Sequence, residues 1–531
     1  MTLLDVVFAV TLVLVAIVLF CAFSVYNNYR HAKHIPGVWQ LIFAPFKIPI
    51  ISDYVYFGSH ETIQKLIREK GDPKTQTVRV SLMSRNAVII SDKNLLKELL
   101  IVKGNNFIKP IATYDAFNVF GPNILSILDA NSEAWKNHHR VASGAFASKN
   151  LEYMSTVASN SVDLIRSTKW DKEIEASKTR SIMIDSNSDF SDITLDVLGK
   201  AGFGLDFSIF DQVSKEGRNF RNALEIMFTK GIILRRFILP NALLSWTLPY
   251  LSKWMGVTQA HQVVSKKLDE IIHERRKEMI HKGDSNVTSD SSSDERKDLL
   301  SILVEANINE KGLLNDEELK SDAFIFSLAG HETTSTALQW TCYELAKRPH
   351  IQQHVREEID ALLGKGLNAR SPNYDHYPHL NYVNAVIMES MRIHPPVTQV
   401  VRVTKKTTQV GDIVIPKDTG VLVSIFSANR SERNWDRPEE FIPERFPMNY
   451  EEQAKIQHDF AWLPFSAGNR KCIGFKFALI EACIILSRLL QFYTLELGND
   501  ESNPNDQVTD VKGVTVRPGN LKLILKHRTD L

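Results

Sequence analysis

The sequence predicts a mainly α-helical protein with a smaller β portion, preceded by one N-terminal transmembrane helix. Residues 6–26 form an apolar run of about the length that spans a bilayer. Residues 77–90 carry alternating and β-branched stretches around a short turn, a pattern typical of a β-hairpin. Residues 151–279 space their apolar side chains at helical intervals. These three observations place a membrane anchor first, then β elements, then a helical body.

Bulk properties exclude several classes of protein. The 531 residues are 44% hydrophobic and 24% charged, which excludes disorder throughout the chain. A net charge of +1 gives no basic excess, so we expect no nucleic-acid partner. The four cysteines lie far apart, without the short spacings of a zinc site or a disulfide framework. A reducing compartment fits this cysteine usage.

The N-terminal run predicts a retained anchor with the body of the protein on the cytosolic side. Arg30 and Lys33 follow the apolar run, whereas residues 1–5 contain no basic side chain. A cleaved signal peptide is the alternative, with a loose small-x-small site at residues 22–24. The apolar run exceeds the usual signal length and no basic segment precedes it, which favours the anchor.

The anchor, linker and body have predicted boundaries. We expect the anchor at residues 1–28 and a linker at residues 29–50, because three prolines exclude a long helix there. Residues 51–531 then form one catalytic domain. Within it, residues 283–297 are rich in Ser and Asp and predict a mobile surface loop. Residues 231–257 are apolar, aromatic and basic, and either pack inside or dip into the bilayer surface.

Short local signals predict further elements. Asp92 is placed to cap a helix that runs through Leu99. Residues 411–423 alternate around a turn and predict a second hairpin, and residues 514–525 predict two strands around a Pro-Gly-Asn turn.

One cysteine stands in a distinctive context near the C-terminus. Cys472 lies between two glycines, beside Arg470 and Lys471, and an apolar helical stretch follows it. Glycines let the backbone turn sharply and approach a bound group closely. The start of a helix and neighbouring cations favour a thiolate, which is a nucleophile or a metal ligand. The alternative is a buried cysteine that acts as a small apolar side chain.

Residues 465–474 resemble the haem-thiolate loop of the cytochrome P450 family, F-x-x-G-x-R-x-C-x-G, at every specified position. The matching residues are Phe465, Gly468, Arg470, Cys472 and Gly474. The resemblance implies heme b (iron protoporphyrin IX) as cofactor, with Cys472 as the axial iron ligand. It also implies that Arg470 holds a haem propionate and that both glycines let the loop and the next helix pack against the porphyrin.

A second motif interrupts a helical run at residues 329–334. Gly330 and consecutive threonines are poor helix formers, and a threonine hydroxyl can bond back to the i−4 carbonyl and bend a helix. The segment resembles the family's oxygen-binding motif, A-G-x-[DE]-T-[TS]. By that resemblance Thr333 supports oxygen activation and Glu332 delivers protons. A satisfied polar pair in a structural helix is the alternative.

Two further groups are expected around the haem propionates. Residues 134–146 resemble the family's W-x-x-x-R helix, with Trp135 matched but His139 in the arginine position. His139 shares a helix face with Trp135, so we favour it over Arg140 as the propionate contact. Trp135 as plain core remains the alternative. Arg402 corresponds to a position that often binds a propionate in relatives.

The family's supporting charge network is also present. Glu389 and Arg392 are three residues apart and match E-x-x-R, and Arg445 belongs to a P-E-R-F segment. The resemblance implies that these three side chains form a buried network beneath the haem loop. Their role is structural, not catalytic.

The predicted function is a haem-thiolate monooxygenase that inserts one oxygen atom from O2 into a lipophilic substrate. The chain has no dinucleotide-binding fingerprint, so electrons come from a separate protein. By resemblance the donor is the NADPH-cytochrome P450 reductase, with cytochrome b5 as a second donor, at the endoplasmic reticulum membrane. Two alternatives are a haem-thiolate isomerase or dehydratase and a non-enzymatic haem sensor. Intact Glu332 and Thr333 argue against the former.

Overall fold

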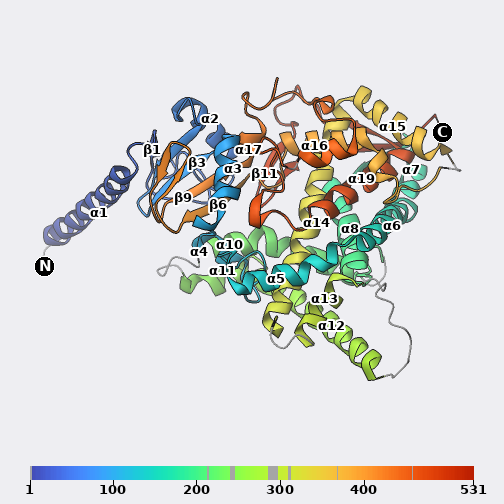
Figure 1. The fold of residues 1–531 in the computed structure, drawn as a ribbon, viewed down its shortest axis with the longest axis horizontal. Helices are drawn as coiled ribbons and strands as arrows, with labels where there is room; N and C mark the ends of the chain where they lie inside the picture. Colours follow the sequence, from blue (N-terminus) through green and yellow to red (C-terminus); the bar gives the residue numbers. More distant parts are fainter. Residues whose placement is uncertain are drawn as a thin grey trace. The chain divides into compact units, whose positions relative to one another are not determined.

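A computed structural model describes residues 3–211, 215–238, 245–284, 297–308, 313–366, 369–456 and 458–530. Residues 285–296, on which most of the predicted mobile loop falls, lie outside this set. The chain forms two compact units. The first comprises Met1–Thr113, Thr398–Pro438 and His458–Arg470, and the second comprises Tyr114–Val397, Glu439–Gln457 and Lys471–Leu531. The predicted fold class is confirmed, since helices dominate and strands form a smaller portion (Figure 1).

The first unit is built around a six-stranded mixed sheet with strand order β1-β2-β3-β9-β6-β4. Apolar side chains of β3 and β9 meet α3 in one buried cluster, which anchors the sheet. The elements of this unit are α1 (Leu3–His31), β1 (Gly37–Trp39), α2 (His60–Lys70), β2 (Thr77–Ser81), β3 (Asn86–Ile90), α3 (Lys93–Lys97), β4 (Phe107–Ile108), β6 (Gln399–Thr404), β7 (Thr408–Val410), β8 (Ile413–Ile415), β9 (Gly420–Ser424) and α17 (Ile425–Asn429). Helix α4 (Ile111–Tyr114) crosses the boundary between the units.

The first predicted hairpin is confirmed and the second is wrong. Strands β2 and β3 pair antiparallel, from Thr77 opposite Ile90 to Ser81 opposite Asn86. Asp92 caps α3, and its side chain accepts from two backbone amides. Strands β8 and β9 follow one another but pair elsewhere, β8 with β7, and β9 with β3 and β6. Alternation predicted each strand correctly, but partners across a sheet depend on non-local packing.

Helix α1 is the one described helix long and apolar enough to cross a membrane. Its last turn is attached to the β2–β3 hairpin, because the Asn28 side chain donates to the carbonyls of Leu82, at 2.7 Å, and Met83, at 3.1 Å. The side chain of Asn86 in turn donates to the Asn28 carbonyl at 2.7 Å. The helix ends at His31, and β1 lies within residues 29–50 and pairs with β2.

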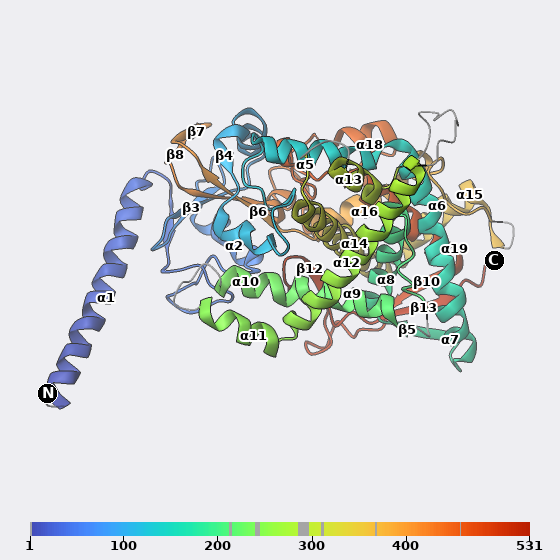
Figure 2. The same cartoon turned by 90° about the horizontal axis from the view of Figure 1, so that it is seen from below.

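The second unit is mainly helical, and α14 runs through it, in contact with α8, α12, α16 and α19 (Figures 1 and 2). A three-stranded sheet of order β10-β13-β5 and the pair β11-β12 complete it. Its helices are α5 (Glu133–Ser143), α6 (Ser148–Ile165), α7 (Asp171–Ala176), α8 (Ser186–Val197), α9 (Glu216–Ile226), α10 (Ile232–Ile238), α11 (Leu248–Trp254), α12 (Val257–Asp284), α13 (Leu299–Ile308), α14 (Asp316–Lys347), α15 (Pro349–Leu363), α16 (Asn381–Ile393), α18 (Tyr450–Ile456) and α19 (Phe475–Phe492). Its strands are β5 (Ser181–Ile184), β10 (Tyr493–Leu497), β11 (Thr509–Lys512), β12 (Val516–Gly519) and β13 (Leu523–His527).

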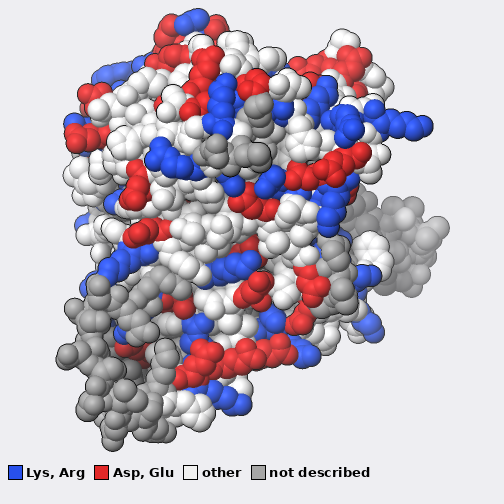
Figure 3. All heavy atoms as spheres, turned by 90° about the vertical axis from the view of Figure 1, so that its right-hand side faces the viewer, with Lys and Arg blue, Asp and Glu red and all other residues white. Residues whose placement is uncertain are grey.

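Charges on the surface are mixed in sign. On the face drawn in Figure 3, Lys and Arg side chains alternate with Asp and Glu rather than forming one large patch. This pattern agrees with the near-zero net charge of the chain and gives no footprint for a polyanion on that face.

Candidate active site

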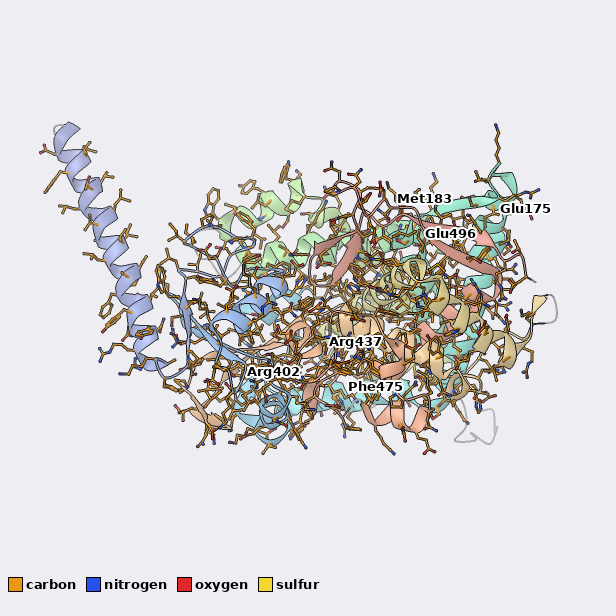
Figure 4. All side chains as sticks on the ribbon, turned by 90° about the horizontal axis from the view of Figure 1, so that it is seen from above. Glu175, Met183, Arg402, Arg437, Phe475 and Glu496 are labelled. Atoms are coloured by element: carbon orange, nitrogen blue, oxygen red, sulfur yellow. The ribbon has the colours of Figure 1, made fainter. Side chains whose placement is uncertain are left out.

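The cysteine loop ends in a short turn that leads directly into α19. Gly474 caps this helix, and Phe475 is its first residue (Figure 4). The Cys472 side chain is exposed, in contrast to the buried Cys342 and Cys483. Surrounding protein atoms nevertheless raise the pKa of the Cys472 thiol by desolvation, and the Gly474 amide and Lys471 oppose that rise only in part. A coordinated metal ion would reverse the balance, because it deprotonates a thiol ligand outright.

The middle of α14 is accessible at three positions only. From residue 321 to residue 342 every residue is buried except Ala329, Gly330 and Thr333. Thr333 lies four residues beyond Ala329 and three residues beyond Gly330, so it shares a side of the helix with each of them. The Thr333 hydroxyl donates to the Ala329 carbonyl at 2.9 Å, which is the back-bonding expected of a threonine here. The oxygen-binding motif therefore presents a small, open face with one hydroxyl on an otherwise buried helix.

Glu332 points away from that open face. Its side chain is 4% exposed, and it accepts a hydrogen bond of 3.3 Å from the Thr515 hydroxyl, just before β12. Burial raises the pKa of Glu332, and Arg517 lowers it by a smaller amount. The acid and the alcohol are thus adjacent in sequence but face different surroundings, about 100° apart around the helix.

Helix α5 carries the predicted tryptophan and histidine on one face. The rings of Trp135 and His139 lie 4.7 Å apart between centroids, and Trp135 is buried. Arg140 is exposed on another side of the helix. Sequence reasoning missed His138, whose Nδ1 lies 2.6 Å from the buried carboxylate of Asp322 on α14. No local signal marks that pair, since its members are 184 residues apart.

The predicted support network is brought together in the second unit. Both Glu389 and Arg392 are fully buried, and Arg392 donates to the carboxylate of Glu389 at 2.7 and 2.9 Å. Arg445 donates to the same carboxylate at 3.0 Å, and the Ile442 amide donates at 2.8 Å. Removing one member of such a buried pair typically costs about 3–5 kcal/mol, because the partner charge stays buried.

In the first unit, two arginines lie near a buried lysine. Lys109 is 5% exposed, and burial lowers its pKa well below the ordinary value, with further lowering by Arg470 and Arg402. Sequence reasoning named both arginines and missed Lys109, because no local pattern marks a lysine that tertiary packing buries. Positive charges that are held close together and away from water favour the binding of an anionic group such as a carboxylate.

The remaining loop residues of the first unit are positioned by close packing. Gly468 has a φ of 73°, and an added Cβ would lie 2.1 Å from the Leu100 carbonyl oxygen, so only glycine fits there. The Phe465 ring lies 5.9 Å from that of Trp462 between centroids. In the second unit, by contrast, Gly474 has an ordinary φ of −87°, with Phe146 beside it at 3.6 Å from an added Cβ.

These features fit a haem. An accessible thiol at the start of a helix suits a thiolate-bound iron, and an open face of small residues on α14 suits a flat macrocycle. Buried basic side chains suit its carboxylates. The fold and the site together define a mainly helical haem-thiolate protein.

Comparison with known proteins gives the family. The cytochrome P450 family model matches residues 44–525, and the chain belongs to this family. It is 29% identical to cytochrome P450 3A29 of Sus scrofa, over 81% of the chain and 83% of that protein. It is 26% identical to the chloroplastic cytochrome P450 97B2 of Glycine max, over 84% and 79%. It is also 26% identical to the probable cytochrome P450 4d20 of Drosophila melanogaster, over 87% and 89%.

Membership has direct consequences for the activity. The chain is a P450 monooxygenase, an oxidoreductase with a haem iron cofactor that takes electrons from a redox partner and acts on a lipophilic substrate. The predicted family, fold and enzyme class are confirmed.

Proposed function

We propose that this chain is a microsomal-type P450 monooxygenase, with one catalytic body spanning residues 51–531 and a single-pass anchor in the endoplasmic reticulum membrane. The body lies on the cytosolic side and receives electrons from the NADPH-cytochrome P450 reductase, with cytochrome b5 as a second donor. The absence of a dinucleotide fingerprint from the sequence and the apolar helix α1 support this assignment. Because one of the relatives is chloroplastic, experiments have to establish which membrane holds α1.

The cofactor in this proposal is heme b, bound through Cys472. Bound haem supplies the oxygen chemistry, in which one atom of O2 enters the substrate and the other leaves as water. Arg470 and Arg402, with Lys109 beside them, bind the propionates through charge-assisted hydrogen bonds. Trp135 and His139 are proposed as further propionate contacts. Glu389, Arg392 and Arg445 keep the segments that carry them rigid.

The chain's own acid–base groups are Thr333 and Glu332. The Thr333 hydroxyl lies on the open face of α14 and both donates and accepts hydrogen bonds, so it orients a polar atom beside that face. The carboxyl of Glu332 holds its proton more tightly than an ordinary glutamate, which suits a proton donor at neutral pH. Rotation of its side chain away from Thr515 would let it pass a proton toward Thr333.

Aromatic side chains on the second unit support contact with a membrane. Trp246, Tyr250 and Trp254 are 69%, 72% and 82% exposed and lie four residues apart, on one side of α11 and the turn before it. All three belong to the apolar, aromatic and basic segment at residues 231–257. At the start of that segment, Ile232 and Leu234 are buried. Residues 239–244 lie outside the described part of the chain. Exposed tryptophan and tyrosine are characteristic of a membrane interface.

The observation that carries the proposal is the accessible thiol of Cys472 at the start of α19. The test is the absorption spectrum of the dithionite-reduced protein with carbon monoxide, for wild type, Cys472→Ala and the control Cys21→Ala. We expect the strongly red-shifted Soret band of a thiolate-bound haem in wild type and in the control, and its loss in Cys472→Ala. An unchanged spectrum in Cys472→Ala would refute the ligand assignment.

Addition of reductase and NADPH then separates the alternatives. Consumption of NADPH that increases with a lipophilic substrate supports the monooxygenase with this electron donor. A thiolate spectrum without any reductase-dependent turnover would instead favour the haem sensor or an enzyme that needs no oxygen activation.

A further inference from the structure

Strands β11 and β12 form a two-stranded hairpin that pairs with no other strand among the described residues. A hairpin of two strands is only marginally stable by itself, so its position depends on contacts with the rest of the protein. Its turn bears on the candidate active site, because Thr515 in that turn donates to the Glu332 carboxyl at 3.3 Å. The contacts that fix the hairpin therefore also fix the surroundings of Glu332.

The backbone of Val516, the first residue of β12, is bound on both sides. Its amide donates to the Pro396 carbonyl at 2.9 Å, and its carbonyl accepts from the indole N–H of Trp340 at 2.9 Å. Trp340 lies on α14, eight residues after Glu332, which is about two turns of the helix (Figure 2). The start of the hairpin's second strand thus meets the same helix at two separate places.

The indole of Trp340 is itself held in one orientation. It is 3% exposed, and the His394 ring stacks on it with 4.0 Å between centroids and 2° between the ring planes. His394 Nε2 lies 2.6 Å from a carboxylate oxygen of Glu344, which fixes the imidazole in turn. A large ring that is packed on its face gives its N–H group a defined direction.

The next residue of the strand attaches it to two more helices. Arg517 donates to the Asn187 side chain on α8 at 2.8 Å and to the Glu225 carboxylate on α9 at 3.0 Å. These bonds are made by a long side chain, whereas the bond from Trp340 reaches the backbone itself. Because Thr515 directly precedes Val516, a fixed Val516 backbone determines where the Thr515 hydroxyl lies.

We propose that Trp340 is a positioning residue that fixes the backbone of β12, so that Thr515 keeps the Glu332 carboxyl away from the open face of α14 until Glu332 rotates. This inference rests on the proposed function of Glu332 and adds to it a residue outside the family motifs. Without the bond from Trp340 the turn moves and Thr515 releases the carboxyl, which then passes protons before the substrate is in place. O2 in that case takes two electrons from NADPH and two protons and leaves as hydrogen peroxide.

The first experiment measures hydrogen peroxide released per NADPH consumed. It uses the haem-loaded protein with reductase and the lipophilic substrate that raises NADPH consumption in wild type. Trp340→Phe keeps a ring that can stack on His394 but lacks the indole N–H. We expect it to raise peroxide release at least about threefold, the change in an equilibrium that one lost hydrogen bond produces. Thr515→Val should raise it to a similar extent, and the double variant should add nothing further, as expected for two groups in one linkage.

A Glu332→Gln background separates this role from a loosened hairpin that simply admits water. Glutamine has the same length as glutamate but no acidic proton to deliver. Trp340→Phe should therefore raise peroxide release in the wild-type background and leave it unchanged in Glu332→Gln. The matched control is Tyr343→Phe, which removes another hydrogen bond from α14, the one to Glu501 in the segment before the hairpin. Peroxide release in this control should stay at the wild-type value.

Hydrogen–deuterium exchange tests the contact without turnover. Residues 513–519 should exchange faster in Trp340→Phe than in wild type, because the Val516 backbone loses one of its two anchors, and at the wild-type rate in Tyr343→Phe. Unchanged exchange in Trp340→Phe would overturn the proposal, and so would an equal rise of peroxide release in both backgrounds. Both results are distinct from failure of the proposed function of Glu332, in which Glu332→Gln alone would keep wild-type coupling.

Discussion

At the scale of single residues, Thr333 shows how one hydroxyl is made available within a buried helix. Its neighbours along α14 are buried on every other side, and its back-bond to Ala329 fixes the direction of the hydroxyl. The carboxyl of Glu332 is turned to Thr515, so the hydroxyl rather than the acid lines the open face.

We therefore predict that Thr333→Ala uncouples oxygen use from product formation and leaves the thiolate spectrum intact. Loss of a positioned proton-transfer group typically costs about 10²–10⁴-fold in the step that it serves. Product formed per NADPH and the hydrogen peroxide released measure this effect. Thr333→Ser keeps a hydroxyl at the same position and should retain most of the coupling. Tight coupling in Thr333→Ala would contradict the proposed role.

At the scale of elements, the pair His138–Asp322 joins α5 to α14. Burial by itself lowers the pKa of His138, but the carboxylates of Asp322 and Glu318 outweigh it, so the pKa of His138 is raised overall. Asp322 also accepts from the Ile124 amide at 2.9 Å, which adds the segment before α5 to the same junction. His138, which lies between the carboxylates of Asp322 and Glu318, therefore joins the helix that carries Trp135 and His139 to the helix that carries Thr333.

This junction should make stability depend on pH. A histidine whose pKa is raised on folding stabilises the folded state fully below its unfolded pKa of about 6.5, and the contribution is lost as pH rises through the folded value. His138→Gln should thus cost about 1.5–3 kcal/mol at acidic pH and less at alkaline pH. Denaturant unfolding of both proteins across this range measures the difference. A cost that does not change with pH would contradict the raised pKa of His138.

At the scale of the whole molecule, the anchor is continuous with the first unit. Asn28 and Asn86 join the last turn of α1 to the β2–β3 hairpin, and Arg79 stacks over the Tyr29 ring at 4.7 Å. These contacts attach α1 to the sheet of the first unit. They come from Asn28 and Tyr29, where the predicted anchor ends and the predicted linker begins.

Membrane attachment should accordingly depend on two separate surfaces. Deletion of residues 3–24, which leaves the contacts of Asn28 in place, should release most of the protein from microsomal membranes. Some of the protein that lacks residues 3–24 should stay on the membrane. Changing Trp246, Tyr250 and Trp254 to serine in that deletion variant should release this remaining fraction, because each large aromatic side chain contributes apolar area at the interface. Flotation with liposomes measures both steps, and the exposed Met183→Ser serves as the control. Full retention after the deletion would contradict α1 as the main anchor.

The sequence by itself determined the features that depend on local spacing. An apolar run of bilayer length, a hairpin with its turn, a capped helix and the residue order of each motif are all encoded within short segments, since backbone and neighbouring side chains decide them. The family followed from those motifs, and with it the enzyme class and the haem.

Only the tertiary structure decided which distant groups meet. The partners of β8 and β9, the pairing of His138 with Asp322, the clustering of Lys109 with Arg402 and Arg470, and the direction of Glu332 have no counterpart in local sequence. Burial and charge act through space, so a pattern read along the chain contains the residues of a site but not the surroundings that set their protonation and direction.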